Sequence, residues 1–151
     1  MKVIIASDHA GYEYKQVLIE YLLSKGFEMI DLGTNSADIP DDYPDRAADA
    51  AEALMQHKAD RGILICGSAV GVSIAANKFR GIRAGVCHDT YSAHQSVEHD
   101  NVNILCLGER VIGIELAKEI ALRFLSASFS GEERHKRRLH KIELIEQKNM
   151  K

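Results

Sequence analysis

The sequence predicts a three-layer, doubly wound α/β domain, a Rossmann-like fold in which about five parallel strands carry helices on both faces. Strand and helix signals alternate along the whole chain. The strand segments are apolar throughout instead of alternating, as in parallel sheets that are buried on both faces. The 151 residues, 46% of them hydrophobic, fit a single domain that spans positions 1–151. In such folds, ligands bind beyond the carboxyl ends of the strands.

The expected strands are short runs rich in β-branched and other apolar residues. They span Lys2–Ala6, Phe27–Leu32, Gly62–Cys66, Ile82–Cys87 and Asn103–Leu107. The expected helices show apolar residues at helical spacing or a high alanine content. They span Tyr12–Lys25, Asp45–His57, Val70–Phe79, Thr90–Glu98 and Ile114–Leu125. Gly26 is a stop signal for the first helix, and Pro44 suits the first turn of the second. A basic helix, roughly Glu132–Gln147, closes the chain.

Composition excludes several classes of protein. The formal net charge of −3 argues against nucleic acid or an anionic membrane as partner. The N-terminus becomes polar too soon for a signal peptide, and no apolar run approaches the roughly 20 residues of a membrane span. The three cysteines, Cys66, Cys87 and Cys106, are an odd number without C-x-x-C spacing. We therefore expect no disulfide framework and no metal site, and a reducing, cytoplasmic location.

The stretch Arg61–Gly71 carries the most informative pattern. An apolar strand ends in Cys66, a Gly-Ser-Ala-Val-Gly loop follows at once, and the loop leads into a helix. Backbone N–H groups and the positive end of a helix favour an anion, and they favour a thiolate over a thiol. A base and an oxyanion cradle in one loop are what proton abstraction beside a carbonyl requires.

Other polar residues also follow the expected strands. Asp8 and His9 come after the first strand and are candidates to grip sugar hydroxyls or phosphate. His99 lies between an expected helix and an expected strand, and histidine titrates nearest to neutral pH. Arg134 and Arg138 are four residues apart in the basic tail, so they share a helix face and can clamp a phosphate.

Each candidate also has an ordinary structural explanation. A strand-end cysteine is often a small buried hydrophobe, which is the interpretation we adopt for Cys87 and Cys106. Ser68 is expected to be the N-cap of the following helix, with or without a role in holding an enediolate. An Asp-His pair after a strand can cap a helix, and a histidine at a helix C-terminus is favoured by the dipole. A basic run is usually a solvated helix face.

Taken in order, the motifs resemble the family of type B ribose-5-phosphate isomerases, which includes the galactose-6-phosphate isomerase subunits. The resemblance covers essentially the whole chain. Its motifs are Ser7-Asp-His-Ala-Gly11, Asp42-Tyr-Pro44, Gly62–Ser68, Ser73–Lys78 with Gly81-Ile-Arg83, the His99-centred loop, Gly108–Gly113 and Arg134-His-x-x-Arg138.

The resemblance implies reversible interconversion of ribose 5-phosphate and ribulose 5-phosphate, a step of the non-oxidative pentose phosphate pathway, with no metal or other cofactor. Cys66 would move the proton between C1 and C2, and His99 would assist ring opening. The enediolate would lie in a cradle formed by Gly67, Ser68, Ala69, Val70 and Gly71. Asp8, His9, Tyr43 and Asp100 would contact the sugar, and Arg110, Arg134 and Arg138 the phosphate.

The resemblance also implies a homodimer, because in this family the tail arginines reach into the site of the neighbouring subunit. Arg134 and Arg138 would therefore be contributed across the interface, and dimers could pair further into tetramers. Relatives that lack the cysteine use a glutamate shortly after the glycine loop as base. Here that position is Val72, which places the chain in the cysteine branch.

Two positions depart from the family pattern. Ala69 replaces a glycine, which costs about 1 kcal/mol if the position needs a positive φ. Asp100-Asn101 replaces the Asn-Asp that follows the histidine in many relatives. An ionised aspartate only accepts hydrogen bonds, so either Asp100 accepts from a sugar hydroxyl or Asn101 makes that contact.

Two further functions stay open at this point. The first is an isomerase for a 6-phosphohexose, such as galactose or allose 6-phosphate, which differs in the length of its pocket. The second is a sugar-phosphate-binding module without catalysis, which the glycine loop alone would fit. Cys66 and His99 together favour an enzyme.

Overall fold

The fold is built on one five-stranded sheet whose strands are all parallel. The computed structural model describes residues 1–150. Its strands lie in the order β2-β1-β3-β5-β4, and every neighbouring pair is parallel. The strands are β1 (Lys2–Ser7), β2 (Glu28–Asp31), β3 (Arg61–Cys66), β4 (Ala84–Val86) and β5 (Ile104–Gly108). The predicted doubly wound parallel sheet is therefore confirmed.

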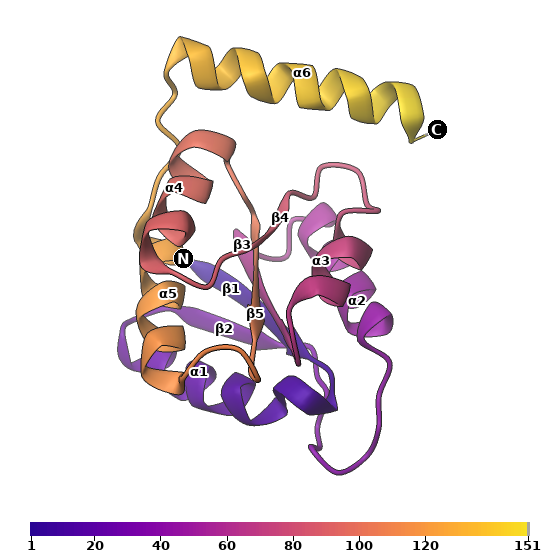
Figure 1. Ribbon diagram of the computed structural model, residues 1–151, viewed down its shortest axis with the longest axis vertical. Helices are drawn as coiled ribbons and strands as arrows, with labels where there is room; N and C mark the ends of the chain where they lie inside the picture. The colour runs from indigo at the N-terminus through magenta and orange to yellow at the C-terminus, as the bar shows by residue number, and fades with distance from the viewer. Residues whose placement is uncertain (151) are drawn as a thin grey trace.

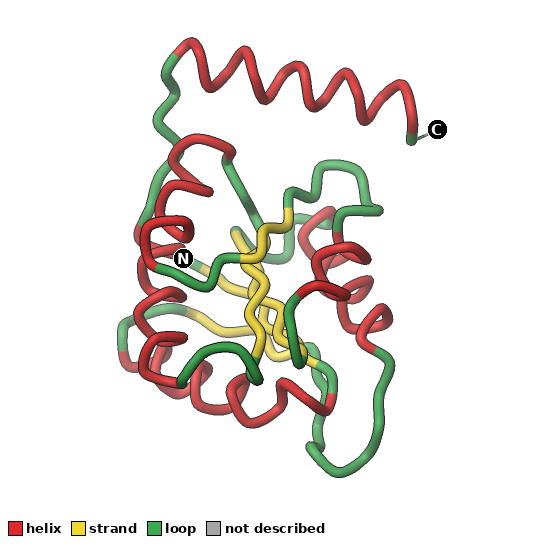
Figure 2. The backbone as a smooth tube through the Cα atoms, in the orientation of Figure 1, coloured by secondary structure: helices red, strands yellow, loops and turns green. Residues whose placement is uncertain are grey.

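Helices cover both faces of this sheet (Figure 1). They are α1 (Tyr12–Ser24), α2 (Tyr43–Met55), α3 (Val70–Ala76), α4 (Thr90–Asp100), α5 (Ile114–Ser126) and α6 (Glu133–Asn149). A short 3₁₀ turn, η1 (His9–Gly11), links β1 to α1 and was not predicted. Helices α1, α4 and α5 pack on one face and α2 and α3 on the other, while α6 runs across one end of the molecule (Figures 1 and 2).

Two hydrophobic clusters, one on each face, account for this layering. On β1, Val3 and Ile5 point into the cluster with α1, α4 and α5, whereas Ile4 and Ala6 point into the cluster with α2 and α3. All four are 0% exposed. The unalternating apolar strands of the sequence thus reflect burial on both sides, as expected for a parallel sheet.

Some element boundaries differ from those expected. β4 is shorter than the expected strand Ile82–Cys87, because the N–H of Ile82 donates to Phe79 O in a turn and that of Arg83 donates to the Asn103 side chain. α3 ends at Ala76, since Lys78 and Phe79 donate to carbonyls three residues back. Among residues 1–150, no helix has the length and apolar character needed to cross a membrane.

The strand order creates a crevice at the carboxyl edge of the sheet. β1 and β3 are neighbours, but the chain leaves β1 toward β2 on one side and leaves β3 toward β4 on the other. Ligands bind at such a reversal in open α/β sheets. Asp8 directly follows β1 and Cys66 ends β3, so both residues lie at this crevice.

Candidate active site

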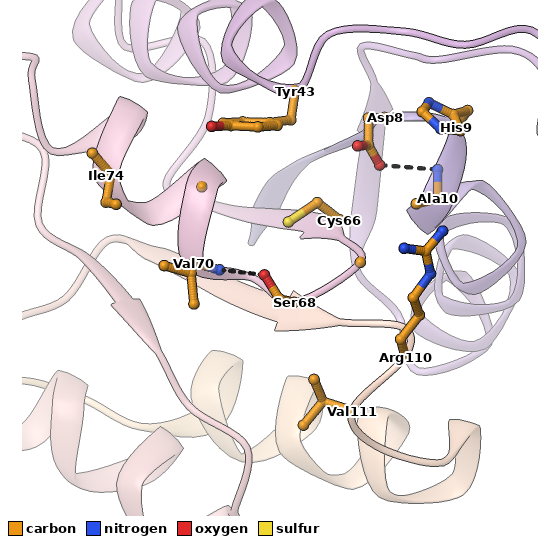
Figure 3. Close-up of a pocket in the computed structure, with 12 residues that line it drawn as sticks. Asp8, His9, Ala10, Tyr43, Cys66, Ser68, Val70, Ile74, Arg110 and Val111 are labelled. Atoms are coloured by element: carbon orange, nitrogen blue, oxygen red, sulfur yellow. Dashed lines mark hydrogen bonds between the residues drawn. The ribbon is translucent and has the colours of Figure 1, made fainter.

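A cavity of about 580 Å³ occupies the crevice and has Cys66 in its wall. The Cys66 side chain is only 4% exposed, yet its sulfur is directed toward the cavity (Figure 3). The backbone N–H of Ala69 donates to Cys66 Sγ across 3.1 Å. The loop that follows β3 therefore supplies a hydrogen-bond donor to this sulfur.

The two other cysteines lack this setting. Cys87 and Cys106 are also free, but burial raises the pKa of each thiol above its ordinary value. Cys106 is 0% exposed, in the middle of β5. Neither residue lines the cavity. Their interpretation as structural residues agrees with these positions.

Two glycines bring the loop backbone close to side chains that line the cavity. A Cβ built on Gly71 would stand 2.5 Å from ring atoms of Tyr43, and one on Gly67 would stand 3.3 Å from Arg110 Nη1. The Tyr43 ring and the Arg110 guanidinium therefore lie directly against the loop. Tyr43 also begins α2, which carries its ring over the mouth of the site.

The backbone at Ala69 adopts the conformation that the sequence left open. Its φ is 74° and its ψ −15°, in the left-handed region. Ala69 is also the N-cap of α3, so the expectation that Ser68 is the N-cap was wrong. Ser68 instead accepts a long hydrogen bond of 3.4 Å from the N–H of Val70. Because the N–H groups of Ala69 and Val70 are engaged, they are not free to hold an oxyanion in this state.

Asp8 and His9 stand on the opposite wall, held by backbone donors. Asp8 Oδ1 accepts from the N–H groups of Ala10 and Gly11, at 3.0 and 3.2 Å. Burial raises the pKa of the Asp8 carboxyl, an effect that its neighbour His9 and these two bonds oppose. His9 Nδ1 accepts from the N–H of Asp41 across 3.0 Å, which leaves Nε2 for a ligand.

The segment after β5 is tied to the glycine loop through consecutive backbone donors. The N–H of Glu109 donates to Cys66 O at 2.9 Å, and that of Arg110 donates to Gly67 O at 3.1 Å. Just before them, the N–H of Gly108 donates to His88 Nε2 at 3.0 Å. Arg110 is thus fixed beside Cys66, and its side chain enters the cavity as expected (Figure 3).

Sequence reasoning missed three residues of the cavity wall. Ala10, Ile74 and Val111 line it together with the expected residues. Ala10 and Val111 lie inside the motifs quoted above, next to Asp8-His9 and Arg110. Ile74 follows Val70 by one helical turn, and this spacing could have placed it on the same face of α3.

Five of the expected site residues do not line this cavity. Ala69 belongs to the glycine loop but is 0% exposed, and the other four lie elsewhere. His99, Asp100, Arg134 and Arg138 are not among the residues, within 1–150, that line the cavity around Cys66. His99 belongs to the last turn of α4, not to a loop as expected, and the chain enters β5 at Ile104. These four residues therefore gather at the amino edge of the sheet.

The strand register sets the distance between the two groups. Ile104 is level with Gly62, whereas Cys66 is level with Gly108. At about 3.3 Å per residue, the four residues from Ile104 to Gly108 separate the amino edge from the level of Cys66 by about 13 Å. One chain cannot bring its own His99 to its own Cys66.

Comparisons with known proteins show the family of this chain. The profile of the family described as Ribose/Galactose Isomerase matches residues 3–142. The chain belongs to the ribose/galactose isomerase family. Ribose-5-phosphate isomerase B of Escherichia coli is 46% identical, with 97% of each chain covered. D-erythrulose-4-phosphate isomerase 2 of Mycolicibacterium smegmatis is 42% identical, with 85% of this chain and 86% of the relative covered.

Solved structures of family members superpose closely on this chain. Ribose-5-phosphate isomerase B of Clostridium thermocellum is 49% identical and has a TM-score of 0.94, with 98% of this chain and 99% of the other covered. The enzyme of Mycoplasma genitalium, solved with bound ribulose-5-phosphate, is 41% identical and has a TM-score of 0.91, covering 98% and 97%.

Proposed function

We propose that this protein is an aldose–ketose isomerase that interconverts ribose 5-phosphate and ribulose 5-phosphate through a cis-enediolate. The observation that carries the proposal is the Cys66 sulfur, directed into the crevice between β1 and β3 and receiving an N–H from its own glycine loop. Membership of the ribose/galactose isomerase family supports the reaction class. A relative with bound ribulose-5-phosphate supports a five-carbon substrate.

In this mechanism the open-chain aldose lies with its C2 hydrogen against Cys66. The thiolate takes that hydrogen as a proton, the C1–C2 bond gains double-bond character, and O1 becomes an oxyanion. The Ser68 hydroxyl and the backbone N–H groups of the glycine loop other than those of Ala69 and Val70 stabilise this charge. The hydroxyl on O2 then passes its proton to O1, and the thiol returns its proton to C1 as the carbonyl forms at C2. Arg110 binds the phosphate and orients the sugar, so part of the binding energy serves the chemical step.

We further propose that a second copy of the chain completes each site. His99 would open the ring, Asp100 would contact the sugar, and Arg134 and Arg138 would hold the phosphate, all from the partner subunit. The distance between the two edges of the sheet supports this arrangement. So does the apolar rim of the cavity, where Val70, Ile74 and Val111 are 53%, 57% and 54% exposed. Such a rim favours burial against another protein surface.

Mixed dimers test this sharing. Cys66→Ala and His99→Ala should each abolish turnover of ribose 5-phosphate. When the two inactive variants are unfolded, mixed and refolded together, random pairing should restore about a quarter of the wild-type sites. No recovery, despite dimers that form normally by sedimentation, would contradict sharing. Full activity of a monomer would also contradict it.

The function itself is tested by a coupled isomerase assay with purified wild-type protein and a chelator present. We expect turnover of ribose 5-phosphate, with a higher kcat/KM than for galactose 6-phosphate or allose 6-phosphate. D-erythrose 4-phosphate belongs in the same series because a 42%-identical relative carries the name of a four-carbon isomerase. Binding of ribose 5-phosphate without turnover would instead favour the non-catalytic module.

The three free cysteines fit a reducing compartment, and we propose the cytoplasm.

A further inference from the structure

His135 is a buried histidine to which the reaction above gives no role. Within α6 it is the one buried side chain, at 2% exposed. Its ring stacks on that of His99, with centroids 4.2 Å apart and an angle of 27° between the planes. Its Nδ1 lies 2.6 Å from the hydroxyl of Ser130, in the segment before α6. This ring is therefore fixed, and it covers one face of His99.

His99 is held on a second side by its own helix. The amide nitrogen of Gln95, one turn earlier in α4, lies 2.9 Å from His99 Nδ1. Nε2 is then the ring nitrogen left to face a substrate. Together, Gln95 and His135 restrict both the plane of the His99 ring and the direction in which Nε2 points.

The charges around the stack favour a neutral His135. Burial, and then the neighbouring His99 and Arg134, lower its pKa, and Arg138 acts in the same direction. Glu132 alone opposes them. A neutral ring can lie against a protonated His99 without placing two positive charges in contact.

Two hydrogen bonds besides the contacts of His135 attach α6 to the rest of the molecule. At its start, the N–H of Ser130 donates to Glu98 O at 2.9 Å. Near its end, the N–H of Gly81 donates to Glu146 Oε1 at 2.9 Å. Removing the His135 ring leaves both of these bonds in place.

We propose that His135 is a positioning residue for ring opening, which acts by holding the His99 ring in place. The inference rests on the proposed function. Ring opening breaks the C1–O4 bond of the furanose, removes the proton from O1 and places one on O4, which leaves an aldehyde at C1. An imidazole that changes its orientation is poorly placed to transfer protons at these two oxygens. The transfer between C1 and C2 at Cys66 does not use His99.

The two steps can be measured separately. Ribulose 5-phosphate carries its phosphate on O5 and cannot close a furanose ring. Exchange of its C1 hydrogen with deuterium from D₂O, followed by NMR, therefore reports the proton transfer at Cys66 alone. For His135→Ala we expect turnover of ribose 5-phosphate to fall about tenfold while this exchange stays within about twofold of wild type.

Two variants serve as controls. His135→Phe keeps a ring in the stack but loses the bond to Ser130, so its turnover should fall less than that of His135→Ala. His140→Ala removes an exposed histidine from the same helix, with a 67% exposed side chain, and should change neither rate. If His135→Ala does not fold, Ser130→Ala frees the same ring by removing its hydroxyl partner, and it should lower turnover without lowering exchange.

Equal losses of turnover and exchange in a folded His135→Ala or Ser130→Ala variant would overturn the proposal, because they would mean a general disturbance of substrate binding. Unchanged turnover in His135→Ala would overturn it as well. A wild-type protein with neither turnover nor exchange would contradict the proposed isomerase function instead.

Discussion

The two edges of the sheet contribute to the proposed site in different ways. At the carboxyl edge, Cys66 is 4% exposed, and backbone hydrogen bonds from Ala69 and Glu109 hold its surroundings. At the amino edge, Arg134 and Arg138 are exposed on the surface of α6, and the position of His99 depends on side-chain contacts. Main-chain hydrogen bonds position the Cys66 region, whereas side-chain contacts position His99.

This difference separates what each region can do alone. Backbone donors at a strand end are positioned by the fold itself, so the proton-transfer region is already formed in one subunit. Exposed side chains on helices need a partner surface before they meet a substrate. Substitutions at the carboxyl edge should therefore impair the site of their own subunit, while those at the amino edge should impair the site of the partner subunit and depend on assembly.

The largest effect is expected at Cys66. Cys66→Ala removes the proposed base, so kcat should fall by about 10³-fold or more, within the range of acid–base contributions. Binding of ribose 5-phosphate, measured by calorimetry, should stay similar, because the phosphate and ring contacts remain. Near-normal turnover would remove Cys66 from the role of base.

The arginines offer a direct comparison of the two edges. Loss of one charge-assisted contact to phosphate should raise KM by about 10- to 100-fold in both Arg110→Ala and Arg134→Ala, with a smaller fall in kcat. When Arg134→Ala is refolded together with Cys66→Ala, the mixed dimers should contain complete active sites, because the Cys66→Ala subunit supplies the missing arginine.

Refolding Arg110→Ala together with Cys66→Ala should give no complete site, because Arg110 and Cys66 belong to the same half of the site. Steady-state kinetics on refolded mixtures measures both. An unchanged KM in Arg134→Ala would count against a phosphate clamp on α6.

A smaller effect is expected from the strained backbone of the glycine loop. Ala69 has a φ of 74°, a conformation that costs an L-residue more than it costs glycine. Ala69→Gly should relieve this strain, but glycine also loses more backbone entropy on folding. The free energy of unfolding should therefore rise by only about 0.5 kcal/mol. Ala75→Gly, within α3, should lower it by about 1 kcal/mol. Chemical denaturation measures the free energy of unfolding of both variants. An equal decrease in Ala69→Gly and Ala75→Gly would show that the backbone at Ala69 is not strained.

The smallest effect is expected from His88 and concerns pH. Burial lowers the pKa of His88 below its ordinary value of 6.5, against the opposing effect of Asp89. The neutral ring accepts the N–H of Gly108. Its contribution to stability is therefore fully present above pH 6.5 and is lost as pH falls through the lowered value.

The Tm of wild type should therefore fall more steeply as the pH is lowered below 6.5 than that of His88→Gln, which keeps an acceptor that does not titrate. Parallel curves would show that the protonation of His88 does not matter. Asp89→Asn provides a control for the neighbouring charge.

Much of the carboxyl edge could be predicted because local patterns determine it. An apolar run ending in Cys66 and followed by small residues indicates strand, turn and helix, and it placed Gly67–Gly71 beside the thiol. Asp8, His9, Tyr43 and Arg110 were found through motifs and do line the same cavity. Ser68 as N-cap was wrong, because the left-handed backbone at Ala69 moves the helix start by one residue.

The amino edge could be predicted less well. His99 was expected in a loop and is helical, since α4 continues to Asp100 and ends at Asn101 with a φ of 47°. In the sequence His135 lies among charged residues, and a surface or structural role was expected for it. Its burial depends on α6 lying against α4, a contact between segments far apart in the chain.

The sequence by itself determined the parallel sheet, its apolar strands and the thiol at a strand end, because these depend on burial periodicity and on turn residues close together in the chain. Only the tertiary structure decided that Asp8, Cys66 and Arg110 share one cavity while His99 and Arg134 stand at the opposite edge. That partition follows from strand order and from the packing of α4 and α6, which arise from contacts between distant segments and are not written in any local pattern.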